Sequence, residues 1–325
     1  MRAIRRIGAV CLALASLQAA ALAHEASAPA KVSFYFAAHE DDWQLFMNPS
    51  AFADVAEPTT KAVFVHLTAG DAGWGSGTAG RKHPYYLARE NGAEAAIHFM
   101  ADSDLPREQS VAPTRFNGHP IYRVGYRNTV TYFLRLPDGH ITGSGYRETG
   151  YQSLQRLSEG KVPTLTAIDN STTYHGWDDL LATLRAIIEH ERGAAAAVQL
   201  NVTELDEKLN PGDHSDHRMS GKAALEAASG LTCARRLHYI NYASAHLPEN
   251  LTAQQRDMES SVYAVTAAGV LALDHKNIWQ RYYQSFLGRS YFRVEEGGPC
   301  DPPRSTVADA ARGNAERQRS APHAK

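Results

Sequence analysis

Residues 31–42 read KVSFYFAAHEDD, an apolar and aromatic run of strand length that stops abruptly at four polar residues. A second run of this kind, AVFVHL at 62–67, ends in TAGDAG at 68–73. The segment from about 83 to 100 carries apolar residues at helical spacing and predicts a helix. Strand, loop, strand, loop and helix in this order predict the start of an α/β sheet.

The second half of the chain continues this pattern. We expect an amphipathic helix at 177–191, a buried strand at 194–202, a helix from the stretch PGDHSDH at 211–217 to Ala228, and a strand at 237–242. The whole predicts a Rossmann-like, mostly parallel sheet with helices on both faces. Extra C-terminal helices are expected at about 252–269 and 275–287.

Residues 103–175 break the regular alternation of strands and helices. They contain five prolines, many glycines and only short hydrophobic patches. We interpret this segment as an insertion of loops and short strands. Long loops in compact domains tend to be functional, so the insertion is a candidate for shaping a substrate cleft.

The N-terminus has the features of an export signal. Arginines precede an apolar run at 7–22, and residues 21–23 supply small side chains for cleavage. The run is short and Ala-rich for a membrane anchor, which is the alternative interpretation. We therefore expect residues 1–23 to be removed, leaving a domain at 24–300 that is secreted or periplasmic and not stably inserted in a membrane. Residues 301–325 have little apolar content and are expected to be disordered.

Charge and cysteine content narrow the possible partners and metal ligands. The formal net charge of −2 does not indicate a nucleic acid or an anionic membrane surface as a partner. Cys233 and Cys300 follow the expected signal, which is too few for a cysteine-based zinc site, so any metal must use histidines and carboxylates. In an oxidising compartment the two cysteines can pair or stay separate thiols, and the sequence leaves both open.

Two clusters of histidine and aspartate each follow a predicted strand. The first is HEDD at 39–42, and the second is HSDH at 214–217. Each alone fits a helix cap or a solvated turn equally well. Because the carboxyl ends of neighbouring parallel strands open into one crevice, we expect the two clusters to converge.

Convergence would assemble a hydrolytic metal site. His39, Asp42 and His217 would supply two imidazoles and a carboxylate, leaving one position for water, whose pKa bound zinc lowers to about 7. Asp41, next to a ligand in sequence, is the candidate general base for that water.

The second cluster adds two further candidates for the reaction. His214, roughly one helical turn before His217, is a candidate for stabilising the oxyanion as an imidazolium and for protonating the leaving amine. Asp216 is a candidate for accepting a histidine hydrogen bond that fixes the tautomer.

These residues resemble the motifs of a known family. The string AHEDD at 38–42 is similar to the AHPDD motif of the PIG-L (LmbE-like) N-acetylglucosaminyl deacetylases, and HSDH at 214–217 is similar to their HPDH motif. LTAGDAG at 67–73 resembles the family's T-x-G-D-x-G segment, and Arg89-Glu90 resembles its Arg-Glu-rich helix. The resemblance covers 31–100 and 177–245 and would place the chain in an exported branch.

The resemblance implies roles residue by residue. It implies zinc on His39, Asp42 and His217, Asp41 as general base, His214 as oxyanion stabiliser or acid, and substrate contacts from Arg89 and Asp71. The chain departs from the pattern at three positions: the motif prolines are Glu40 and Ser215, and the acid that often follows the helix arginine by three residues is Gly92.

The leading hypothesis is a zinc-dependent hydrolase that removes acetyl from an N-acetylated amino sugar or glycoconjugate. The same ligands also accept iron, cobalt or nickel. The alternatives are a zinc hydrolase of another amide or ester, and a non-catalytic glycan-binding protein whose metal site Glu40 has disabled. The natural sugar and the oligomeric state stay open. Five aromatic residues are candidates either for stacking on sugar rings or for packing: Trp74, Tyr146, Tyr151, Tyr174 and Trp177.

Overall fold

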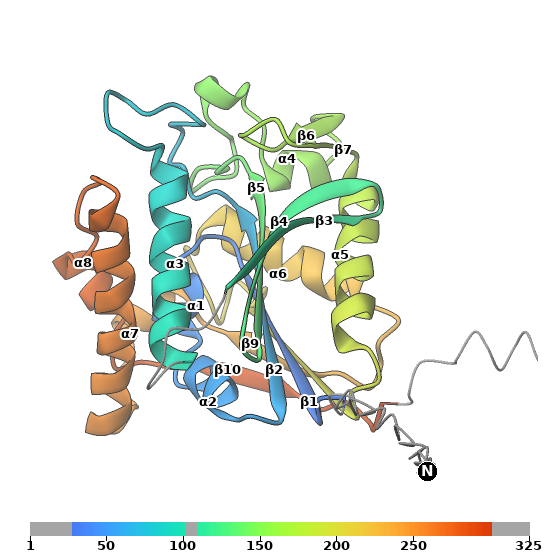
Figure 1. Cartoon of the computed structure of the whole chain (residues 1–325), viewed down its shortest axis with the longest axis vertical. Helices are drawn as coiled ribbons and strands as arrows, with labels where there is room; N and C mark the ends of the chain where they lie inside the picture. Colours follow the sequence, from blue (N-terminus) through green and yellow to red (C-terminus); the bar gives the residue numbers. More distant parts are fainter. Residues whose placement is uncertain (1–27, 102–108, 301–325) are drawn as a thin grey trace, which may run out of the picture.

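A computed structural model describes residues 28–101 and 109–300 of the chain. The expected signal peptide at 1–23 and the expected disordered tail at 301–325 lie outside the described residues. Within the described part, eight strands form one sheet, which runs through the middle of the molecule (Figure 1). In sheet order the strands are β10 (Phe292–Glu295), β9 (Arg235–Tyr239), β8 (Ala197–Thr203), β1 (Lys31–Ala37), β2 (Thr60–Thr68), β5 (Thr129–Leu136), β4 (His119–Tyr126) and β3 (Ser110–Phe116).

The centre of the sheet is parallel and its edges are antiparallel. The five central strands, β9, β8, β1, β2 and β5, are all parallel to one another. At one edge β10 pairs antiparallel with β9, and at the other β4 pairs antiparallel with both β5 and β3. The expected Rossmann-like, mostly parallel sheet with helices on both faces is confirmed. Its carboxyl edge is therefore where the loops after β1, β2, β5 and β8 gather.

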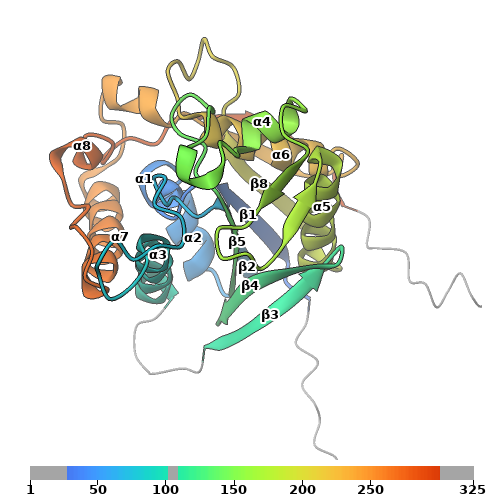
Figure 2. The same ribbon diagram turned by 90° about the horizontal axis from the view of Figure 1, so that it is seen from above.

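The sequence of β1 explains why this strand is central. Val32, Phe34 and Phe36 point into one core cluster, while Tyr35 and Ala37 point into the other. Successive side chains of a strand alternate between the two faces, so an unbroken apolar run requires cover on both sides. The helices supply that cover (Figure 2).

The helices divide between the two faces of the sheet. On the face of Phe34, apolar residues of α4 (Leu154–Ser158), α5 (Trp177–Arg192) and α6 (Ser215–Ala227) complete the core. On the face of Tyr35, the core is completed by α1 (Asp42–Phe46), α2 (Ser50–Ala56), α3 (Tyr85–Ala101) and α7 (Ala253–Ala272). The helices α3 and α7 lie side by side, and α8 (Arg281–Gln284) lies beyond them (Figure 1).

The segment expected as an insertion is only partly separate from the sheet. Residues 110–136 form β3, β4 and β5, and β5 pairs with β2 in the centre of the sheet. The remainder, up to Trp177, holds loops, a 3-10 turn η1 (Arg147–Thr149), α4 and a small sheet of β6 (Thr164–Thr166) and β7 (Thr173–His175). The sequence did not show that these strands belong to the main sheet. The alternation of residues within one strand does not indicate which strand it pairs with.

The C-terminal region also differs in detail from expectation. In place of the helix expected at 275–287 the structure has only the short α8, and the helix expected at 252–269 corresponds to α7. Cys233 and Cys300 form a disulfide, which resolves the choice that the sequence left open. Among the helices of the described residues, none combines the length and apolar character needed to cross a bilayer.

Candidate metal centre

The two histidine-aspartate clusters meet at the carboxyl edge of the sheet. The first follows β1, and the second opens α6 after β8, the parallel neighbour of β1. Nδ1 of His39 lies 3.2 Å from Nε2 of His217, although 178 residues separate them. The pairing of β1 with β8 thus brings both clusters into one buried site.

Three side chains present ligand atoms to a common point. Oδ1 of Asp42 lies 3.1 Å from Nε2 of His217 and 3.5 Å from Nδ1 of His39. With the 3.2 Å separation of the two nitrogens, these atoms form a nearly equilateral triangle. Zinc with ligands at about 2.1 Å in tetrahedral geometry requires edges of roughly 3.4 Å. The triangle therefore fits a small divalent ion.

Hydrogen bonds hold two of these ligands in the required orientation. The backbone N–H groups of Ala38 and His39 both donate to Oδ2 of Asp42 at 2.8 Å, which leaves Oδ1 for the centre of the triangle. Nδ1 of His217 lies 2.8 Å from Oδ1 of Asp213. A proton on that nitrogen leaves Nε2 as the electron-pair donor, as in carboxylate–histidine–metal arrangements.

The electrostatics of the triangle favour a positive charge at its centre. Burial opposes charge on His217, yet Asp42 and Asp213 raise the pKa of this imidazole to about 10. His39 behaves in the same way, because Asp42 outweighs burial and raises its pKa well above the ordinary value. The carboxylates thus stabilise a cation here, which a divalent metal ion would supply in place of protons.

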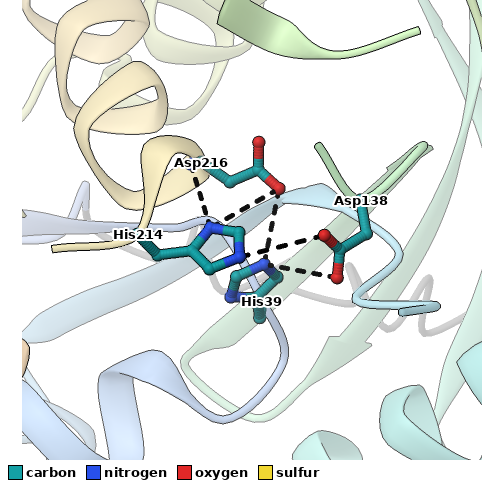
Figure 3. Close-up of side chains that lie close together, drawn as sticks. All are labelled: His39, Asp138, His214 and Asp216. Carbon is teal, nitrogen blue, oxygen red and sulfur yellow. Dashed lines mark hydrogen bonds and ion pairs between the residues drawn. The ribbon is translucent and has the colours of Figure 1, made fainter. Parts of the chain in front are cut away.

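A second group of four side chains shares His39 with the triangle. It contains Asp138, His214 and Asp216, and its potential ligand atoms all lie within 4.8 Å of one another (Figure 3). Nε2 of His39 lies 3.5 Å from Oδ2 of Asp216 and 3.9 Å from Oδ2 of Asp138. The first of these separations equals the longest edge of the triangle, and the second is wider. Asp216 also accepts the backbone N–H of Gly139 at 2.7 Å, so this group fits support of His39 better than a second ion.

His214 has a defined tautomer in this structure. It caps α6, and its Nδ1 accepts the backbone N–H of Asp216 at 3.1 Å. A neutral ring therefore carries its proton on Nε2, which lies 3.9 Å from Oδ1 of Asp138. Burial, reinforced by His39 and His217, lowers the pKa of His214 far below its ordinary value. This geometry presents a neutral N–H donor, whereas the sequence analysis expected an imidazolium.

Asp41 is held by the arginine of α3. Its carboxylate contacts Nη2 of Arg89, whose Nε lies 3.0 Å from Oε2 of Glu40 and whose Nη1 donates to the carbonyl of Gly70 at 3.3 Å. All four residues are buried. The guanidinium of Arg89 therefore has partners on three sides, and its expected contact with substrate stays a prediction.

The close approach of Arg89 explains a glycine in the TAGDAG segment. A Cβ on Gly70 would lie 2.7 Å from the carboxylate of Glu40 and 2.8 Å from the guanidinium of Arg89, and the residue has a φ of +49°. Glycine adopts such a conformation without steric cost. The segment is thus shaped around the buried Glu40–Arg89–Asp41 cluster.

Asp71 connects two of the loops that surround the site. Its Oδ1 accepts the backbone N–H of Asp138 at 2.9 Å, and its Oδ2 accepts that of Gly75 at 2.7 Å. The side chain is completely buried. These bonds tie the loop after β2 to the loop after β5 and so position Asp138, while the expected substrate contact of Asp71 stays a prediction.

Sequence reasoning missed two carboxylates of the site. Asp138 follows β5 at the carboxyl edge of the sheet, a position that would have marked it had the strand been recognised as central. Asp213 precedes the HSDH motif and is the partner of Nδ1 of His217, while His214 caps α6. Its distance of four residues before His217 was the available signal, because such pairs face one another on a helix.

The candidate stacking aromatics range from buried to exposed, with Tyr146 and Trp177 partly buried. Tyr174 is fully buried against His119, and Trp177 donates its indole N–H to Glu226 at 2.6 Å, so both serve packing. Trp74 and Tyr151 are each 47 % exposed. Trp74 belongs to the loop after β2, and its ring lies 6.1 Å from that of Tyr85.

Comparisons with known proteins assign no family to this chain. No family model and no curated protein matches it. Among solved structures, it is similar to N,N'-diacetylchitobiose deacetylase from Pyrococcus horikoshii with a bound inhibitor, at a TM-score of 0.45 and 13 % identity over 86 % of this chain and 88 % of that one. It is also similar to GalB, the 4-carboxy-2-hydroxymuconate hydratase of Pseudomonas putida KT2440, at a TM-score of 0.36 and 11 % identity over 90 % and 92 %. Scores this low carry no functional argument, so the chain is defined by its own features as an α/β protein with a buried histidine-aspartate site able to hold a metal ion.

Proposed function

We propose that the chain is a zinc-dependent deacetylase that hydrolyses the acetamide of an N-acetylated amino sugar or glycoconjugate. One observation carries the proposal: the buried triangle of His39, Asp42 and His217, with edges of 3.1 to 3.5 Å. Asp41 directly precedes the ligand Asp42 in the chain, and the ring of His214 lies 4.8 Å from that of His39. The similarity of both motifs to those of the PIG-L deacetylases supports the choice of an acetamide over other bonds.

Each residue of the proposed site has a separate role in hydrolysis. A divalent ion held by the triangle would polarise the acetamide carbonyl and lower the pKa of a water molecule. Asp41 then accepts the proton of the attacking water, and its ion pair with Arg89 holds it in one orientation. His214 donates a hydrogen bond from Nε2 to the developing oxyanion. The same proton is available to the leaving amine.

We also propose that the protein works outside the cytoplasm, as its N-terminal sequence suggests. The Cys233–Cys300 disulfide supports this location, because such bonds persist in oxidising compartments. Glycans of the cell envelope or the surroundings would then be the accessible substrates.

Metal analysis of the purified protein tests the site. We expect about one zinc per chain. His39→Ala and His217→Ala should lose the metal, whereas His246→Ala, at an exposed histidine, should retain it. Retention of metal by both site variants would contradict the ligand assignment, and a chain that never binds metal would favour the glycan-binding alternative.

Acetate release from a panel of N-acetylglucosamine oligosaccharides tests the reaction. Asp41→Asn should keep its metal and lose most turnover, because the carboxylate acts on water and holds no ion. His214→Ala should also keep its metal and lose about 10²–10³-fold in rate, the effect of removing one oxyanion donor. Full activity of Asp41→Asn would overturn the role of this residue. Metal-dependent cleavage of simple esters without acetate release from sugars would favour the second hydrolase hypothesis.

A further inference from the structure

A cavity with aromatic and basic walls lies next to Tyr85, whose ring is close to Arg89. Its volume is about 320 Å³, within the range of small-molecule pockets. Three parts of the chain form it: the loop between β2 and α3, the first residue of α3, and the segment from the end of α7 into α8. Its lining residues are Ala72, Trp74, Arg81, Tyr85, His275, Lys276, Ile278, Gln280 and Tyr283.

The walls of this cavity suit a sugar ring. The rings of Trp74 and Tyr85 lie 6.1 Å apart, and the rings of Tyr85 and His275 lie 5.3 Å apart. Trp74 is 47 % exposed, although an indole of this size is usually covered. Aromatic faces of this kind offer apolar surface together with polar edges, which matches a pyranose.

The charged residues of the cavity all have the same sign. Arg81 and Lys276 are exposed and line it, and none of its lining residues is acidic. Within the described residues, Arg81 donates to the backbone carbonyl of Asp274, and neither Arg81 nor Lys276 forms a salt bridge. Two uncompensated cations beside an aromatic platform favour a ligand that carries negative charge.

The cavity adjoins the reacting groups. Cζ of Arg89, which contacts Asp41, lies 5.8 Å from the ring centroid of Tyr85. One wall residue of the cavity, Tyr85, is therefore separated from Asp41 by the guanidinium of Arg89. A molecule in the cavity would therefore lie beyond Tyr85 and Arg89 from the carboxylate of Asp41.

We propose that this cavity is a subsite for a negatively charged sugar unit, linked to the acetylated amino sugar that reacts. The proposal rests on the proposed deacetylase function and adds a substrate class to it: an acidic glycan in which N-acetylated and anionic units are neighbours. Trp74 and Tyr85 hold the ring of the anionic unit, and Arg81 and Lys276 bind its acidic group.

Calorimetric binding to the metal-loaded, full-length protein tests the subsite independently of catalysis. The probes are a disaccharide of glucuronic acid and N-acetylglucosamine, a sulfated analogue, and neutral N,N'-diacetylchitobiose. We expect at least one anionic probe to bind about 10-fold more tightly than the neutral one, the effect of a charged hydrogen bond. The advantage should shrink with added salt.

Variants locate the preference in the cavity. The double variant Arg81→Gln and Lys276→Gln should abolish the difference between anionic and neutral probes. The matched double variant Arg115→Gln and Lys161→Gln, at cations of β3 and of the loop after α4, should preserve it. Equal affinity for all probes in the wild type, or a preference that survives the first double variant, would overturn the subsite. Acetate release from the neutral probe reports separately on the proposed function.

Discussion

Glu40 is the position at which the chain departs most from the AHPDD motif, and the structure gives it a partner. Its carboxylate is buried and lies 3.0 Å from Nε of Arg89, which also contacts Asp41. Burial raises the pKa of Glu40 to about 8, although Arg89 opposes the shift. One arginine thus serves two buried carboxylates, and neither can lose it without being left as an isolated buried acid.

Removal of Arg89 should lower the free energy of unfolding, and the size of this loss should depend on Glu40. We expect Arg89→Ala to lower the free energy of unfolding by about 3–5 kcal/mol, because breaking a buried ion pair leaves uncompensated charge. At a pH above 8, where Glu40 is ionised, the same substitution in a Glu40→Gln background should cost less, since one of the two carboxylates is then absent. Urea unfolding of the four proteins in this cycle measures the coupling. Equal costs in both backgrounds would show that Arg89 does not serve Glu40.

At the scale of elements, the crossing of α3 and α7 depends on two glycines. A Cβ on Gly92 would lie 2.7 Å from the backbone carbonyl of Thr266, and a Cβ on Gly269 would lie 2.7 Å from Cα of Gly92. The backbones of the two helices are therefore in contact, which no larger residue permits. This packing leaves no room at Gly92 for the acid that the resembled motif often carries three residues after its arginine.

Gly92→Ala should destabilise the protein despite the higher helix propensity of alanine. We expect a loss of about 1–3 kcal/mol, because overpacking forces the two helices apart. Chemical denaturation measures it. Gly230→Ala is the matched control, since a Cβ at that position would have no neighbouring atom within 4 Å. A Gly92 variant as stable as this control would contradict the close contact of α3 with α7.

Glu259 of α7 should make stability fall at higher pH. Its Oε2 accepts the backbone N–H of Gly288 at 2.6 Å, and burial raises its pKa from 4.5 to about 8. The folded protein therefore retains a proton that the unfolded chain releases, so this contribution is complete below about pH 4.5 and is lost as the pH rises through 8.

Glu259→Gln removes this titration while keeping the shape of the side chain. The free energy of unfolding of the variant should rise relative to the wild type between pH 5 and pH 8, as followed by denaturant unfolding at several pH values. A constant difference over that range would show that the carboxyl group does not titrate in this window.

At the scale of the whole molecule, one covalent bond closes the C-terminal region onto the sheet. Cys233 and Cys300 are 67 residues apart, and the intervening segment contains β9, α7, α8 and β10. In the chain-entropy model a loop of this length stabilises the folded state by about 4 kcal/mol.

Substitution of both cysteines by serine should reveal that contribution. We expect the oxidised wild type to unfold at clearly higher denaturant concentration than Cys233→Ser/Cys300→Ser. A reductant should lower the midpoint of the wild type alone. Unchanged midpoints on reduction would mean that the bridge does not contribute to stability, and would remove its support for an oxidising compartment.

The comparison of sequence with structure shows which features could be predicted. The strands β1, β2 and β8 and the helices α3, α5 and α6 lie within a few residues of expectation, because apolar periodicity is a local property. The strands of 110–136 were missed as part of the main sheet because their place depends on pairing with β2, about 70 residues earlier in the chain.

The sequence by itself determined the order of the central strands and helices, and it marked the residues of both histidine-aspartate clusters. Their positions after predicted parallel strands made them candidates for a metal site. Only the tertiary structure decided that Asp138 and Asp213 support those histidines, that Arg89 is shared by Glu40 and Asp41, and that two cations border an aromatic cavity. These relations join loops from different strands, and distances between such loops are set by sheet register and helix packing, which no local pattern records.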